Sequence, residues 1–195
     1  MANFDVLAQQ GAKRFLTFDQ EEMCRRYGLC ADAETISLSF CGEACRVNRH
    51  SGAVAGADGQ PLGPGAMLTI YDMLCSGTAP DALSGTWRTT NMLPGVGQSS
   101  PDDTRLNADW APRLDVPSLA QACEAMGGTP FPVGEVAYRL PVFDWFPVVF
   151  QLWHGDEEFP PSMRFLWDAH ALQFLRYETL YYVMDEVLTR LEAHL

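Results

Sequence analysis

An acidic string is the part of the sequence best suited to chemistry. Residues 152–162 read LWHGDEEFPPS, so Asp156, Glu157 and Glu158 follow a histidine and a glycine directly. Two adjacent carboxylates in an apolar setting can have their pKa values pushed apart and act as general acid and base. The same side chains could instead bind a cation or a polar ligand. They could also do no more than keep an exposed loop soluble where a buried strand ends.

Aromatic side chains crowd the same stretch of the chain. They are Trp145, Phe146, Phe150, Trp153, Phe159, Phe165 and Trp167. Aromatic groups beside a few polar ones are the usual lining of a small-molecule pocket. They are also the usual content of a hydrophobic core. The setting favours a pocket beside the acidic string and leaves the core interpretation open.

The histidines give weak support for a metal site. His154 precedes Asp156 by two residues and His170 follows Asp168 by two. A fold could gather these four side chains with Glu157 and Glu158 around a hard or borderline ion. The sequence has no HExxH or HxH spacing, which would bring ligands together locally. We therefore predict no metal centre, and leave open whether either histidine binds an ion.

The cysteines are also poorly spaced for a metal. Cys41 and Cys45 are the nearest pair, and no paired CxxC spacing occurs. A turn at Gly42 and Glu43 would place Phe40 opposite Cys45 and direct the two thiols to opposite faces of a hairpin. We expect the cysteines to be reduced and to serve mostly as small buried apolar residues.

Composition and missing motifs exclude several classes of protein. The 25 acidic and 13 basic residues give a formal net charge of -12, which argues against binding nucleic acid or an anionic membrane. No apolar run approaches the roughly 18 residues of a membrane span, and the N-terminal residues do not resemble a signal peptide. The GxSxG nucleophile motif and the phosphate-binding P-loop are absent. We predict a cytoplasmic protein with small-molecule or protein partners.

The elements that must position these residues follow an α+β pattern. Apolar residues at helical spacing predict helices near 4–15, 19–28, 67–77, 119–126 and 180–191, the last clearly amphipathic. Alternating residues predict a hairpin over 34–54, a strand near 87, and strands at 135–143 and 147–153, the last buried on both faces. Residues 165–167 suggest a short strand or turn, and 98–115 a long loop. We predict one α+β domain over 1–195, with a mostly antiparallel sheet, flanking helices and an N-terminal helical segment at 1–30.

The acidic string also carries a resemblance to a known family. The segments LPVFDWFPVVFQLWHGDEEFPPSMRFLWD (140–168) and ETLYYVMDEVLTRL (178–191) resemble the C-terminal half of the prokaryotic domain-of-unknown-function family 3786. LSGTWRTTNMLPG (83–95) is similar to an upstream segment of that family. The positions that match are Trp87, Gly95, Trp153, Gly155, Asp156, Glu157, Glu158, Phe159, Pro160 and Asp168. His154 is not among them.

The resemblance implies no established activity or cofactor. Family members look typical of anaerobes, and some resemble fusions to a cysteine-rich iron–sulfur segment of the kind found beside corrinoid methyl-transfer proteins. The resemblance therefore implies a role near corrinoid, one-carbon or redox-cofactor metabolism. It also shifts the expected site from the histidine to the acids and aromatics.

Three hypotheses of function follow. The leading one is a soluble protein that binds a small ligand or cofactor through Trp87, Trp153, Asp156, Glu157, Phe159, Trp167 and Asp168. The second is a hydrolase or transferase that uses two of the acids at 156, 157, 158 and 168 as acid and base. The third is an interaction module that works through its C-terminal helix or an exposed apolar patch. The sequence leaves open the ligand, any catalysis and the oligomeric state, a homodimer included.

Overall fold

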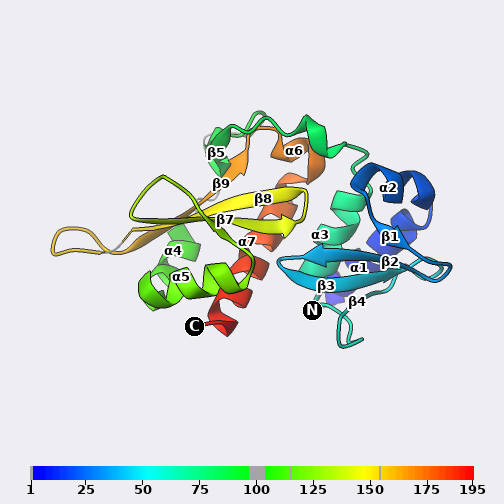
Figure 1. Ribbon diagram of the computed structural model, residues 1–195, viewed down its shortest axis with the longest axis horizontal. Helices are drawn as coiled ribbons and strands as arrows, with labels where there is room; N and C mark the ends of the chain where they lie inside the picture. The colour runs from blue at the N-terminus through cyan, green and yellow to red at the C-terminus, as the bar shows by residue number, and fades with distance from the viewer. Residues whose placement is uncertain (1, 97–103, 115, 154) are drawn as a thin grey trace.

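The computed structural model of the protein describes residues 2–96, 104–114, 116–153 and 155–195. Two antiparallel sheets lie towards the two ends of the molecule, and the long C-terminal helix α7 (Tyr177–Ala193) packs between them (Figure 1). The chain combines helices with two antiparallel sheets, so the predicted α+β class is confirmed. Within the described residues, no helix is both long and apolar enough to cross a membrane.

The first sheet is built around the predicted hairpin. Its strands in spatial order are β1 (Cys30–Ala31), β2 (Thr35–Phe40), β3 (Glu43–Asn48) and β4 (Val54–Gly56). All neighbouring strands are antiparallel. Ile36, Leu38 and Phe40 are buried on one face of β2, as their alternation predicts.

The predicted turn of this hairpin is wrong by one residue. Phe40 pairs with Glu43 rather than with Cys45, so the turn consists of Cys41 and Gly42. Their φ angles are 50° and 83°. Two-residue hairpin turns of the favoured twist need positive φ at both positions and commonly have glycine second, which explains the register.

The second sheet holds the acidic string. Its strands in spatial order are β5 (Trp87–Thr89), β9 (Ser162–Asp168), β8 (Phe146–Trp153), β7 (Val136–Phe143) and β6 (Thr129–Pro130). Every residue of β8 except Trp153 is buried, which confirms that this strand is covered on both faces. The short strand or turn predicted at residues 165–167 is part of the seven-residue strand β9. The string therefore connects two paired strands.

The remaining helices pack on these sheets. They are α1 (Ala2–Phe15), α2 (Gln20–Tyr27), α3 (Pro64–Leu74), α4 (Thr104–Trp110), α5 (Val116–Ala125) and α6 (Ala171–Phe174), with 3-10 turns at Pro80–Ala82, Thr90–Met92 and Ala111–Arg113. Helix α2, predicted near residues 19–28, is capped at both ends. Asp19 accepts a hydrogen bond from the Glu22 amide at 3.0 Å, and Gly28 ends the helix with a φ of 64°.

The prediction of a long loop over 98–115 is wrong where the structure describes this stretch. Residues 104–113 form α4 and the 3-10 turn that follows it. The Asn107 side chain accepts a hydrogen bond from the Met163 amide of β9 at 2.5 Å, and Ala111 is fully buried. Tertiary contacts with β9 therefore fix a short helix that the local pattern does not indicate. Residues 98–103 and 115 lie outside the described residues.

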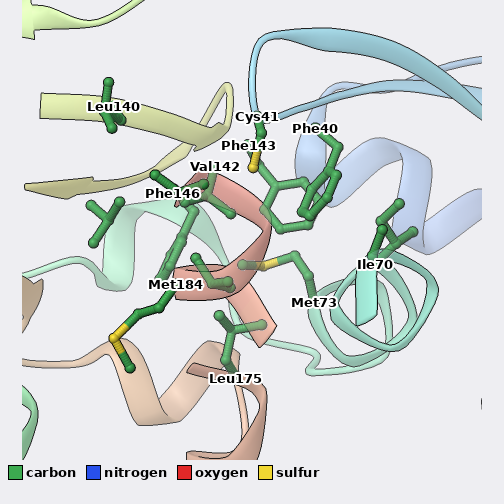
Figure 2. Packing of buried hydrophobic residues seen from close by; sticks show 14 of the residues in the cluster. Phe40, Cys41, Ile70, Met73, Leu140, Val142, Phe143, Phe146, Leu175 and Met184 are labelled. Carbon is green, nitrogen blue, oxygen red and sulfur yellow. The ribbon is translucent and has the colours of Figure 1, made fainter. Parts of the chain in front are cut away.

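The two sheets share a continuous core beside α7 (Figure 2). Phe40 of β2 packs against Phe143 of β7 with ring centroids 5.4 Å apart. At the hairpin tip, the Cys41 amide donates a hydrogen bond to the Val142 carbonyl at 2.9 Å. Met184 of α7 is fully buried in the same cluster. The hairpin therefore joins the two sheets through both packing and a backbone hydrogen bond.

A buried carboxylate ties three helices together. Asp72 of α3 is 4% exposed and accepts hydrogen bonds from the Arg176 backbone amide and Nε, each at 2.7 Å, and from the Thr179 hydroxyl at 2.8 Å. These donors lie at the N-terminus of α7, where amides lack helical partners and the helix dipole favours negative charge. Arg14 of α1 lies 3.4 Å from the same carboxylate.

Candidate functional site

The acidic string forms a tight turn that leaves β8. The Asp156 carboxylate accepts hydrogen bonds from the amides of Glu158 at 2.8 Å and Phe159 at 2.7 Å, and the Asp156 amide donates to the Phe159 carbonyl at 2.8 Å. The hydrogen bond from the Phe159 amide, followed by that from Glu158, lowers the pKa of Asp156. A Cβ at Gly155 would lie 2.6 Å from the Pro161 ring, so only glycine fits there. Glycine, aspartate and proline thus specify the shape of the turn.

This turn forms one wall of a shallow groove on the outer face of the second sheet. The groove has a volume of about 520 Å³ and is lined by Glu135, Trp153, Asp156, Phe159, Pro160, Ser162 and Arg164. The Arg164 guanidinium lies 5.2 Å from the Trp153 ring centroid, within the range of a cation–π contact. Phe159 is 66% exposed at the rim. The groove thus combines aromatic surface with charges of both signs.

The structure brings together three of the seven predicted ligand contacts, which are Trp153, Asp156 and Phe159. Glu157 is exposed in the same turn but does not line the groove. Trp167 points to the inner face of the sheet, away from the groove. Side chains alternate between the two faces along a strand, and Ser162 and Arg164 of the same strand point to the outer face. Trp167 is fully buried in the core, and its indole N–H donates a hydrogen bond to the Thr90 hydroxyl at 3.1 Å.

Trp87 lies on the outer face but outside the groove. It pairs with Asp168 across the β5–β9 ladder, and its ring packs edge-on against Phe131 at 5.7 Å. Phe131 belongs to the segment 131–135, which crosses the outer face and also reaches Trp153 through Gly134. The two tryptophans therefore contact one covering segment at separate places. Ligand binding by any of these residues stays a prediction.

Asp168 is a structural anchor at the opposite end of β9. It is 3% exposed and accepts hydrogen bonds from the Ser84 amide and hydroxyl, each at 3.0 Å, from the Gly85 amide at 2.7 Å and from the His170 amide at 2.9 Å. It lies six positions along β9 from Ser162, which is beside the acidic turn, and six steps of an extended strand span roughly 20 Å. Asp168 and Asp156 therefore do not converge in one cleft.

The pKa of Asp168 gives a testable pH dependence. Burial raises this pKa, but the hydrogen bonds from Ser84, His170 and Gly85 outweigh burial, and the net shift is downwards. A lowered pKa stabilises the folded protein above the ordinary aspartate pKa of about 3.9, and the stabilisation is lost as the pH falls through the folded pKa. We expect Asp168→Asn to lower the free energy of unfolding by about 2 kcal/mol at pH 7. Urea unfolding should show this difference shrinking below about pH 4. A difference that persists unchanged at pH 2.5 would show that the carboxylate charge does not matter.

The two histidines considered as metal ligands give no evidence of a metal site, since one has a hydrogen-bond partner and the other lies outside the described residues. The His170 Nδ1 is 2.7 Å from the Ala82 carbonyl, and His154 is outside the described residues. Among the residues that the structure describes, no three His, Cys, Asp or Glu side chains lie close enough to hold a metal ion. Burial raises the pKa of Cys41 and of Cys45 to about 12, although Arg190 opposes the shift. These two thiols are therefore poor sources of thiolate.

Three further residues line the groove although the sequence does not mark them as site residues, namely Glu135, Ser162 and Arg164. Trp153 pairs with Ser162, and the preceding outward residue Gln151 pairs with Arg164, so all four share one face. A strand predicted from residue 162 would have indicated this arrangement through its alternation. No local pattern indicates Glu135, which comes from the segment that crosses the face.

Comparison with known proteins bears on the same region. The sequence model of a protein family described as Domain of unknown function (DUF3786) matches residues 19–190. The chain belongs to this family. The match to DUF3786 confirms the resemblance based on the acidic string and leaves α1 outside the matched region. No curated protein and no solved structure matches the chain.

Proposed function

We propose that this DUF3786 protein binds a small ligand in the groove beside the acidic turn. The observation that carries the proposal is the Arg164 guanidinium stacked over Trp153 in a groove open to solvent. A cation on an aromatic face can hold the anionic group of a ligand, while Trp153 and Phe159 contact its apolar part. A planar ligand with a carboxylate, sulfonate or phosphate group suits this combination best.

The acidic turn contributes shape to this site. Asp156 holds the turn through the amides of Glu158 and Phe159, and its lowered pKa keeps it charged. The separation of Asp156 and Asp168 by the length of β9 gives no support to an acid/base pair of these two residues. The link to corrinoid, one-carbon or redox-cofactor metabolism rests on the resemblance alone and stays a prediction, as does the cytoplasmic location.

A fluorescence titration tests the proposal with 1-anilinonaphthalene-8-sulfonate, a planar anionic probe. We expect the dissociation constant to rise about tenfold in Arg164→Ala, because a charge-assisted contact of about 1.5 kcal/mol is lost. Trp153→Ala should weaken binding similarly. Arg88→Ala is the matched control, since Arg88 is an exposed arginine of the same sheet outside the groove. Equal affinities in all four proteins would contradict the proposal.

A further inference from the structure

A second cleft, of about 620 Å³, lies at the junction of the two sheets. Tyr27 and Cys30 contribute to one side of it, the hairpin of β2 and β3 forms its floor, and the β7–β8 turn contributes Asp144 and Trp145. Figure 1 shows the tip of this hairpin beside the β7–β8 turn. The cleft is at the opposite end of β8 from Trp153, roughly 20 Å away for an eight-residue strand. It is therefore distinct from the groove described above.

At the cleft, the backbone of one residue of β2 is exposed on an edge of the first sheet. Phe40 and Glu43 flank a two-residue turn, so Phe40 and Leu38 direct their backbone groups to β3. The peptide groups of Ser37 and Ser39 therefore point to the other edge of β2. There Ser37 pairs with Cys30, where the β1 ladder ends. Among the residues that the structure describes, no strand pairs with β2 at Ser39 on this edge, and Ser39 lines the cleft. Its N–H and C=O present an adjacent donor and acceptor.

Aromatic rings stand beside this edge. Trp145 stacks on Tyr27 with centroids 4.7 Å apart and on Phe143 at 5.3 Å. The indole N–H of Trp145 is the one buried side-chain polar group that lacks a hydrogen-bond partner among the described residues. A buried donor without an acceptor is unfavourable and calls for a physical explanation. An acceptor on a bound molecule would supply one after a small movement of the ring.

We propose that this cleft binds a neutral planar heterocycle that carries a lactam edge. Such an edge has an adjacent N–H and C=O, which complement the C=O and N–H of Ser39 as a paired strand residue would. A second carbonyl of the ring can accept from the Trp145 indole. The carboxylate of Asp144 at the cleft disfavours an anionic molecule there.

Cys30 provides a reporter inside the cleft. It is exposed, whereas the other five cysteines are buried. Desolvation by burial raises the pKa of Cys75 to about 11 and of Cys123 to about 12, so these thiols hold little reactive thiolate. A thiol reagent should therefore modify the folded protein at Cys30 first, and a molecule in the cleft should block it.

The experiment follows iodoacetamide modification of Cys30 by mass spectrometry, with lumazine as the lactam probe. We expect lumazine at about ten times its dissociation constant to slow the reaction about tenfold, because only the empty cleft exposes the thiol. The ring-matched 1,3-dimethyllumazine, which lacks the N–H donor, should give no protection. Trp145→Phe should weaken protection by about tenfold in concentration, the equivalent of one hydrogen bond. Trp110→Phe, outside the cleft, should behave as the wild type.

Two results would overturn the inference. One is an unchanged rate at Cys30 up to the solubility limit of lumazine. The other is equal protection by the dimethylated ring, which would show that the lactam edge is not recognised. Arg164→Ala separates this site from the groove at Trp153, because it should leave the protection of Cys30 unaltered.

Discussion

Replacement of Asp72 by alanine should lower the free energy of unfolding by about 3 kcal/mol, the usual effect of removing one partner from a buried charged network. The Arg176 amide and the Thr179 hydroxyl would lose their acceptor at the start of α7. Arg14 and Arg176 are 45% and 63% exposed, so water can solvate their guanidinium groups, and we assign most of the loss to the buried donors. Thermal unfolding should show a midpoint lowered by about 10 °C.

Two variants serve as controls for Asp72. Asp81→Ala removes an exposed carboxylate and should change the free energy of unfolding by less than about 0.5 kcal/mol. Asp72→Asn keeps the shape and an acceptor oxygen, so it should fall between the wild type and the alanine variant. If Asp72→Ala unfolded at the wild-type urea concentration, α7 would not depend on this carboxylate.

Replacement of Trp167 by alanine should lower the free energy of unfolding by about 4 kcal/mol, as large-to-small changes in a core do. The side chain is fully buried, it packs near Phe165 with ring centroids 6.4 Å apart, and its indole satisfies the Thr90 hydroxyl. Trp153→Ala is the matched comparison. Because Trp153 is only partly buried on the outer face, its loss should reduce stability by about 1 kcal/mol.

Urea unfolding monitored by circular dichroism distinguishes the two tryptophans. The structure predicts a large shift of the midpoint for Trp167→Ala and a small one for Trp153→Ala. A larger shift for Trp153→Ala than for Trp167→Ala would mean that Trp153 points into the core and that Trp167 points to the outer face of the sheet.

The fold was largely predictable because its strongest signals are local. The nearly uninterrupted apolar run of β8 predicts a strand buried on both faces, and the Asp19 and Gly28 caps predict the ends of α2. The predicted hairpin register differs from the structure because Gly42 occupies the second turn position and not the first. The helix α4 was missed because its contacts with β9 lie far away along the chain.

The candidate site was predictable only in part. An exposed loop after a buried strand is one interpretation that the sequence supports, and the structure explains this loop by the Asp156 hydrogen bonds and by the close approach of Pro161 to Gly155. Trp167 and Asp168 are predicted to share a ligand site with Asp156 because their side chains can bind a ligand and because they lie nearby in the sequence. An extended strand instead carries Asp168 to its far end and turns Trp167 into the core. Composition alone does not reveal that separation.

The most direct test of ligand binding in the groove is a titration followed through the tryptophan indole signals in ¹H–¹⁵N spectra. The protein has five tryptophans, and each can be assigned by single substitution with phenylalanine. On addition of 1-anilinonaphthalene-8-sulfonate, we predict that the Trp153 signal moves most and saturates, while the signal of the buried Trp167 stays in place. A Trp153 signal that does not move while the probe binds elsewhere, for example at the exposed Phe4 and Val6 of α1, would contradict the proposed site.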